Sequence, residues 1–207
     1  MHQYKDLGTL TNIASGALLI YMVTRLALLG MTFWAYQSVD APGDLSTALG
    51  LMAIVSTIFL VTLIACFILV GRWIYRASAN AHALSTEMTI TPGMAVGWYF
   101  IPIANLFKPY QAMREIWMAS HFRGNWHGEP SPSILVGWWG LWIVVNILDN
   151  ISLRLGGIDE NGDVAGMTTF LDFAAALLNV ALCLVLISLM RQIARAQATA
   201  PYQETFA

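Results

Sequence analysis

Long apolar runs alternate with short polar stretches along the chain. Four runs qualify as bilayer spans, at about residues 10–36, 45–70, 134–153 and 167–190. A helix needs about 20 mostly apolar residues to cross roughly 30 Å of hydrocarbon. The pattern therefore predicts a single all-α membrane domain over residues 1–207, a polytopic protein whose four transmembrane helices form two hairpins.

The segment 71–133 between the second and third runs is mixed in character. It contains a short apolar stretch, 93–107, that is broken by Pro102 and Asn105. Proline removes an intrahelical hydrogen bond but is well tolerated in the first turn of a helix. We therefore expect a re-entrant or interfacial helical segment that is interrupted at Pro102 and restarts close to Pro109.

The helix expected after this break has an amphipathic pattern. Tyr110, Met113 and Trp117 share one face, and Arg114 is placed to reach lipid headgroups. Such a helix is typical of the membrane interface. Together with the break, it predicts a membrane-dipping segment on one side of the bilayer.

Composition supports lipid as the surrounding solvent. The chain is 57% hydrophobic and only 11% charged, with a mean hydropathy of +0.63. Soluble domains usually carry about 25% charged residues. The net charge of −2 argues against nucleic acid as a partner, because phosphate recognition needs clustered cations.

Basic residues gather at the span ends that would lie on one side of the membrane. The loops at 37–44 and 156–166 contain Asp or Glu and neither Lys nor Arg, whereas the segment 71–133 and the region after the last span are rich in Arg and Lys. The positive-inside rule then places both termini and the segment 71–133 in the cytoplasm, in a multi-pass protein of the cell membrane. A fifth span at 93–107 would put Arg114 and Arg123 outside, so four spans are favoured.

Arg25 lies well inside the first predicted span. A charge near the middle of a transmembrane helix costs about 2.5–3.5 kcal/mol on insertion scales, so it should have a partner. At about 1.5 Å per residue, Arg25 and Asp149 both lie roughly 22 Å from the cytoplasmic edge. We expect Arg25 to pair with Asp149, with Asp172 as a second or alternative acceptor.

Further polar residues accompany this pair. Asn146, Asp149 and Asn150 fall at helical spacings of three and four, and Asp172 and Asn179 are seven apart on the last span. Each set shares a face. With Arg25 they predict an intramembrane polar cluster, which either forms a binding site or ion path or fixes helix packing.

Two stretches resemble the signature of a bacterial membrane family. These are WIYRASANAHAL at 73–84 and TPGMAVGWYFIPIANLFKPYQAMREIW at 91–117. They resemble the Pro-Gly start, Gly-Trp pair, Phe-Ile-Pro-x-x-Asn core and Lys/Arg-Pro-Tyr step of the family called domain of unknown function 4328. The similarity is close over about residues 71–120 and rests on pattern alone in the flanking spans. The resemblance implies a location in a bacterial inner membrane and no established activity.

The break itself is a second candidate site. The carbonyl freed by Pro102 and the amide of Asn105 lie near Lys108, Tyr110 and Arg114 in sequence. Such a set could bind a lipid or a quinone. The alternative is a purely structural dip.

Tryptophans mark several predicted span ends. Trp34 and Trp73 fall where an aromatic belt would place them. The alternative is that the tryptophans near residues 138–142 form a stacking site for a flat ligand such as a quinone.

Catalytic motifs are absent from the sequence. His121, His127 and Glu129 form a metal-like grouping, but their spacing matches no zinc pattern, and no phosphate-binding loop or hydrolase elbow occurs. We expect no enzyme activity, no metal and no other cofactor.

Three functions stay open on sequence alone. The favoured one is a small assembly or interaction module that binds a second copy of itself or another membrane protein. The first alternative is a small transporter or channel that uses Arg25, Asp149 and Asp172. The second is a lipid- or quinone-binding protein at 102–105.

Overall fold

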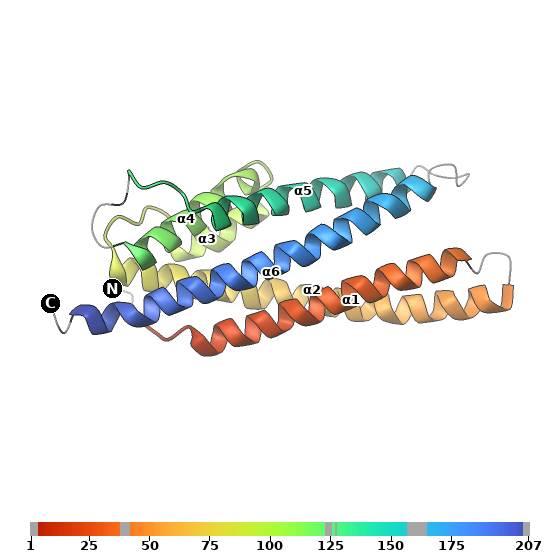
Figure 1. Ribbon diagram of the computed structural model, residues 1–207, viewed down its shortest axis with the longest axis horizontal. Helices are drawn as coiled ribbons and strands as arrows, with labels where there is room; N and C mark the ends of the chain where they lie inside the picture. Colours follow the sequence, from red (N-terminus) through yellow and green to blue (C-terminus); the bar gives the residue numbers. More distant parts are fainter. Residues whose placement is uncertain (1–3, 38–41, 123–125, 127, 157–164, 205–207) are drawn as a thin grey trace. The chain divides into compact units, whose positions relative to one another are not determined.

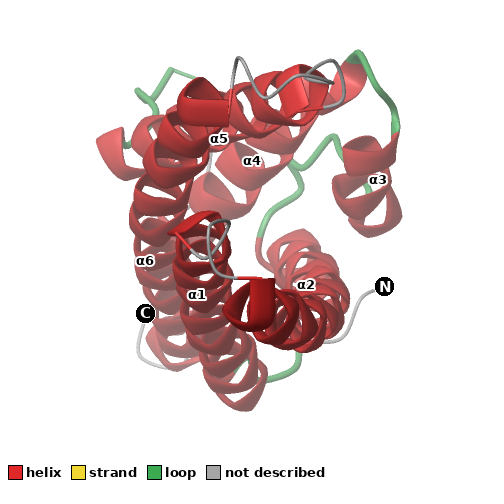
Figure 2. Cartoon of the chain, turned by 90° about the vertical axis from the view of Figure 1, so that its right-hand side faces the viewer, coloured by secondary structure: helices red, strands yellow, loops and turns green. Residues whose placement is uncertain are grey.

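The computed structural model describes residues 4–37, 42–122, 126, 128–156 and 165–204. Most of these residues are helical, and no strand occurs among them (Figure 2). The α-helices are α1 Gly8–Gln37, α2 Pro42–Leu84, α3 Pro92–Gly97, α4 Lys108–His121, α5 Ser133–Gly156 and α6 Ala165–Glu204 (Figure 1). Two short 3₁₀ helices, η1 Trp98–Phe100 and η2 Ala104–Leu106, join α3 to α4.

Four of these helices are long and apolar enough to cross a membrane. The spans are Gly8–Ala35, Ser46–Leu84, Ser133–Gly156 and Gly166–Thr199. The prediction of an all-α polytopic membrane protein with four spans is confirmed. A fifth span does not form, because the apolar stretch at 93–107 is divided among α3, η1 and η2.

α2 and α6 continue well beyond the predicted span ends. α2 has 43 residues and α6 has 40. At about 1.5 Å per residue, α2 is roughly 65 Å long, twice the hydrocarbon thickness. Its extension, 71–84, lies beyond the predicted span end, and its four alanines favour continued helix.

Two compact units divide the chain, and each is described by itself. The first unit comprises Met1–Gly16, Phe67–Trp139 and Val185–Ala207. The second comprises Ala17–Cys66 and Gly140–Leu184. The first therefore holds α3, α4 and the polar extensions, and the second holds most of the apolar length of the four spans.

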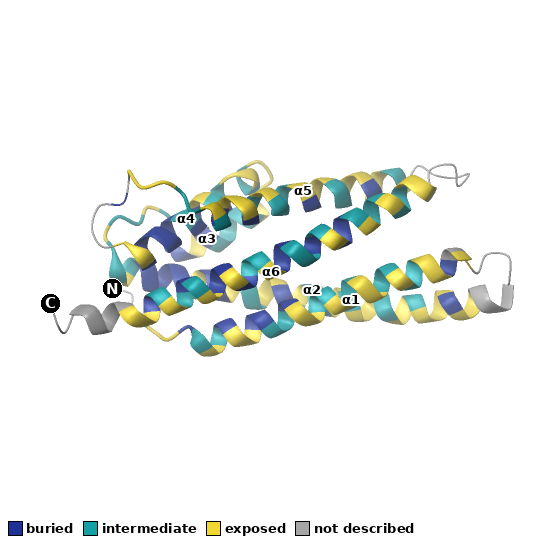
Figure 3. Ribbon diagram, viewed as in Figure 1, coloured by how far each residue is buried: buried dark blue, intermediate teal, exposed yellow. Residues whose placement is uncertain are grey.

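α4 lies in the core of the first unit. Glu115 and the five residues after it, through Ser120, are all buried, and α4 is largely dark blue in Figure 3. One side of α4 therefore packs inside the first unit, while Gln111 and His121 are exposed, and the position of this amphipathic helix at the membrane interface stays a prediction. Trp73 is also fully buried and donates from Nε1 to Thr11 Oγ1 at 2.9 Å, so it belongs to this core rather than to an aromatic belt.

The second unit exposes apolar side chains. Along α2, Ile54, Ile58, Val61 and Ile64 are each about half exposed or more. Such a surface is poorly solvated by water and well solvated by lipid tails, so this unit has the surface expected of a membrane-embedded bundle. Polar side chains inside such a unit need partners within the protein, so they are candidates for a functional site.

The predicted interruption at Pro102 is confirmed. Thr91 caps α3, its hydroxyl accepting from Met94 N at 3.4 Å, and α3 ends at Gly97. The chain becomes helical again in α4, which begins at Lys108 with Pro109 in its first turn. The missing N–H of Pro102 explains why the apolar stretch cannot continue as a helix.

Candidate functional site

An ion pair joins α1 to α5 inside the second unit. Arg25 Nη2 donates to Asp149 Oδ1 at 2.7 Å, and the Arg25 guanidinium lies 5.8 Å from the Phe59 ring of α2. The Arg25 side chain is 19% exposed and that of Asp149 is 42% exposed. The pairing expected from equal depth is present.

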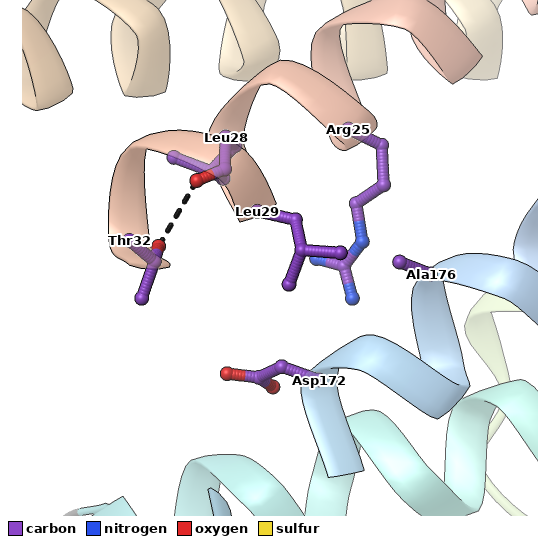
Figure 4. A pocket seen from close by; sticks show the side chains of 6 residues that line it. All are labelled: Arg25, Leu28, Leu29, Thr32, Asp172 and Ala176. Carbon is purple, nitrogen blue, oxygen red and sulfur yellow. Dashed lines mark hydrogen bonds between the residues drawn. The ribbon is translucent and has the colours of Figure 1, made fainter. Parts of the chain in front are cut away.

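Asp172 faces the same region without pairing to Arg25 in the structure. Its Oδ1 accepts from Ser152 Oγ at 2.6 Å, a bond between α6 and α5. Figure 4 shows Arg25 and Asp172 on opposite sides of a cavity of about 80 Å³, which Leu28, Leu29, Thr32 and Ala176 also line. This volume suits a few water molecules and is far below the roughly 300–1,000 Å³ of sites for organic ligands.

Asn179 extends the polar contacts toward the other end of the second unit. Its Nδ2 donates to the Tyr21 hydroxyl at 3.3 Å, and the Tyr21 ring stacks on Phe59 at 5.5 Å. Thr24 and Thr62 share a 3.0 Å hydroxyl contact between α1 and α2. Sequence reasoning missed Tyr21, Ser152 and the two threonines, because single hydroxyls are common in apolar spans and give no distinct pattern.

Asn146 and Asn150 do not join the cluster, which corrects the sequence prediction. Both are exposed, and their Nδ2 atoms donate at 2.8 Å to the carbonyls of Trp142 and Asn146 on their own helix. Successive helix positions differ by about 100°, so Asn146 and Asn150 are turned about 60° and about 100° from Asp149, both in the same direction around α5. α5 thus has one carboxylate turned to α1 and two carboxamides turned outward.

The break places a cation among aromatic rings in the first unit. Lys108 Nζ lies 5.7 Å from the Trp98 ring centroid and 5.9 Å from that of Phe107, and it donates to Gln111 Oε1 at 3.0 Å. Nearby, Asn105 Oδ1 and Trp98 Nε1 are buried and have no hydrogen-bond partner among the described residues.

The other two residues predicted for the break serve packing. The Tyr110 ring lies 6.5 Å from that of Trp139. Arg114 donates to Ser131 Oγ at 2.9 Å and to the Glu129 carbonyl at 2.7 Å. The Arg114 guanidinium thus holds the loop before α5, and its approach to lipid headgroups stays a prediction. Of the metal-like grouping, His121 stacks on Trp117 at 4.0 Å, and His127 lies outside the described residues.

Two buried polar sites in the first unit were missed entirely. Gln197 of α6 donates to the Ala77 carbonyl at 3.0 Å and to Ser120 Oγ at 2.9 Å, and it accepts from Asn80 at 3.0 Å. Elsewhere the Glu115 carboxylate accepts from the backbone N–H groups of Thr89 and Ile90 and from the Thr89 hydroxyl. Both hold helices and connections together, and neither shows a recognisable sequence motif.

Comparison with known proteins gives one match. The chain matches the family described as Domain of unknown function (DUF4328) over residues 36–195. No curated protein and no solved structure is significantly similar to it. The matched region includes the two stretches that carry the sequence resemblance and nearly all of the last three spans, whereas the first span, Gly8–Ala35, lies outside it. Because it covers more than three quarters of the chain, this protein belongs to the DUF4328 family.

Proposed function

We propose that the protein is a non-enzymatic membrane assembly module whose partner is a second copy of the chain. The observation that carries this proposal is the outward position of Asn146 and Asn150 on α5. Asn146 lies near the middle of the span Ser133–Gly156, where a carboxamide facing lipid leaves hydrogen-bonding capacity unused. A facing helix would satisfy it.

The neighbouring surface of α5 suits close helix contact. Gly140, Val144, Ile147 and Ile151 are exposed and follow the spacing of four, three and four that defines one packing seam. A Cβ added at Gly140 would meet nothing within 4 Å, so the described residues leave this position open. Small residues allow helix backbones to approach closely in membranes.

A second copy is the partner that this surface fits best. A carboxamide has both a donor and an acceptor, so the same face on another copy is complementary to it. A two-fold interface uses the same patch on both subunits, which places each asparagine near its counterpart in a parallel pair. The small size of the cavity between Arg25 and Asp172 gives less support to a transport path for organic solutes.

Exchange of both asparagines for leucine should weaken association. Interhelical hydrogen bonds in bilayers contribute about 0.6–1.7 kcal/mol each, so Asn146→Leu with Asn150→Leu should lower the dimerisation constant about tenfold or more. Single-molecule photobleaching of the labelled full chain in liposomes, over a range of protein-to-lipid ratios, measures this constant.

Cysteine cross-linking supplies the matched control. In a chain with Cys66 and Cys183 replaced by alanine, a cysteine at Ile147 should form a disulfide-linked dimer, and one at the equally exposed Val61 of α2 should not. Equal cross-linking at both positions, or an unchanged constant in the double variant, would remove the basis for this interface.

We also propose that the first unit lies on the cytoplasmic side and that both termini are cytoplasmic. The bias of Arg and Lys supports this orientation. In the same cysteine-free chain, a cysteine at the exposed Glu129 should be protected from an impermeant thiol reagent in intact cells. One at Asn161, which lies outside the described residues, should react. The reverse labelling pattern would invert the orientation.

A further inference from the structure

The break between α3 and α4 presents an exposed apolar surface. Phe100 and Ile103 are each 77% exposed, and Leu106 is 57% exposed. Ile101 and Phe107 extend the same surface, which we call the apolar tip, residues 100–107. Loops that face water rarely expose so many large apolar side chains together, and contiguous exposed apolar patches usually mark a contact with protein or membrane.

The backbone of the apolar tip is suited to a medium without water. Irregular backbone enters hydrocarbon poorly because its polar groups lose their partners. Here the N–H groups of Asn105, Leu106 and Phe107 donate to carbonyls within the segment at 2.8, 3.2 and 3.1 Å. Pro102 has no N–H to satisfy. Burial of the tip in lipid would therefore leave few backbone donors unpaired.

Lys108 follows directly after the apolar tip and carries a positive charge. Lys108 is half-buried, lies over the rings of Trp98 and Phe107, and forms no ion pair within the described residues. Lysine and tryptophan beside an apolar surface are typical of the boundary between hydrocarbon and headgroups. The charge of Lys108 is complementary to an anionic headgroup at that boundary.

From these observations we propose that the apolar tip inserts into one leaflet of the bilayer and that Lys108 binds the phosphate of an anionic phospholipid. The tip provides the contact with acyl chains, and Lys108 sets the depth and the headgroup preference. This site lies in the first unit and is separate from the proposed contact surface of α5 in the second. The two proposals can therefore fail independently.

Insertion is tested by the environment of the tip. In the cysteine-free chain, reconstituted in vesicles of phosphatidylcholine and phosphatidylglycerol, a polarity-sensitive fluorophore at Ile103→Cys should report an apolar surrounding. Spin-labelled lipids should quench it. The same fluorophore at Glu129→Cys, an exposed position of the same unit, should stay in water. A water-exposed label at Ile103 would overturn insertion.

Headgroup binding is tested by Lys108→Gln. A lysine close to an anionic membrane surface contributes enough to change affinity about fivefold, so this variant should lose about fivefold in its preference for phosphatidylglycerol over phosphatidylcholine. Lipids retained by the protein, counted by native mass spectrometry from mixed vesicles, give the preference. Arg72→Gln, which removes an exposed cation of the same unit, is the matched control.

The outcomes separate lipid from other sources of phosphate. Added inorganic phosphate should not displace the lipid, and Lys108→Arg should keep most of the preference. Equal effects of Lys108→Gln and Arg72→Gln would show general surface attraction and overturn the site. If Lys108→Gln does not fold, Lys108→Arg decides headgroup binding: a retained preference supports the site and a lost preference overturns it, and the label at Ile103 still decides insertion.

Discussion

Replacing Arg25 with alanine should lower the free energy of unfolding by about 2–3 kcal/mol. The change leaves the Asp149 carboxylate without its partner, 2.7 Å away in the native protein, at a depth where unpaired charge is costly. The effect should stay below that of a deeply buried pair, because the Asp149 side chain is 42% exposed and polar contacts in bilayers are modest. Steric-trapping measurements in bicelles report this free energy directly.

The double variant decides whether the pair is the cause. Adding Asp149→Asn to Arg25→Ala should restore about 1 kcal/mol, because the stranded charge is then neutral. Arg154→Ala, which removes an exposed arginine of α5, is the control and should change little. Strictly additive losses from the two single changes would show that Arg25 acts through its packing on Phe59 rather than through Asp149.

The long apolar runs and the break at Pro102 predicted the fold in outline. Apolar length alone located the four spans, since hydrocarbon thickness sets a minimum that few soluble segments reach. It could not locate the ends of α2 and α6, because their extensions, such as residues 71–84, are stabilised by packing inside the first unit. Trp73, Asn80 and Gln197 are buried there, but a hydropathy scale treats these residue types as polar or interfacial and gives no sign of their burial.

The candidate site was also predicted only in part, because the sequence gives the position of a residue along a helix but not its packing partners. Equal depth along two helices was enough to pair Arg25 with Asp149, because a buried cation in lipid requires a partner. The depth of a residue along a helix does not give the direction in which its side chain points around the helix axis. Asn146 and Asn150 were therefore assigned to the interior of the bundle, although both are exposed. The protein partners of Arg114, Ser131 and the Glu129 carbonyl, were not predicted, because they depend on a loop whose course no local pattern specifies.

Gln197→Leu should have the other large effect, a loss of about 2–4 kcal/mol. Gln197 is fully buried and connects α6 to α2 and α4 through three hydrogen bonds. Leucine fills similar space but leaves the Ala77 carbonyl, Ser120 Oγ and one Asn80 N–H without this partner in a site that excludes water. A buried polar group that loses its partner costs about 1–3 kcal/mol, and partly satisfied networks cost the most.

The control for this variant lies on the same helix. Gln192→Leu is the same chemical change, but Gln192 is only half-buried and its amide donates to Ser188 Oγ within α6, so the free energy of unfolding should change by less than about 0.5 kcal/mol. Asn80→Leu should be costly alone, because Asn80 also bonds the backbone of Lys5 at 3.1 and 2.8 Å. Combined with Gln197→Leu it should cost less than the sum of the two, since both remove the same bond. An additive double variant would mean that Gln197 and Asn80 stabilise the first unit separately, and equal effects of the two glutamine changes would contradict the network.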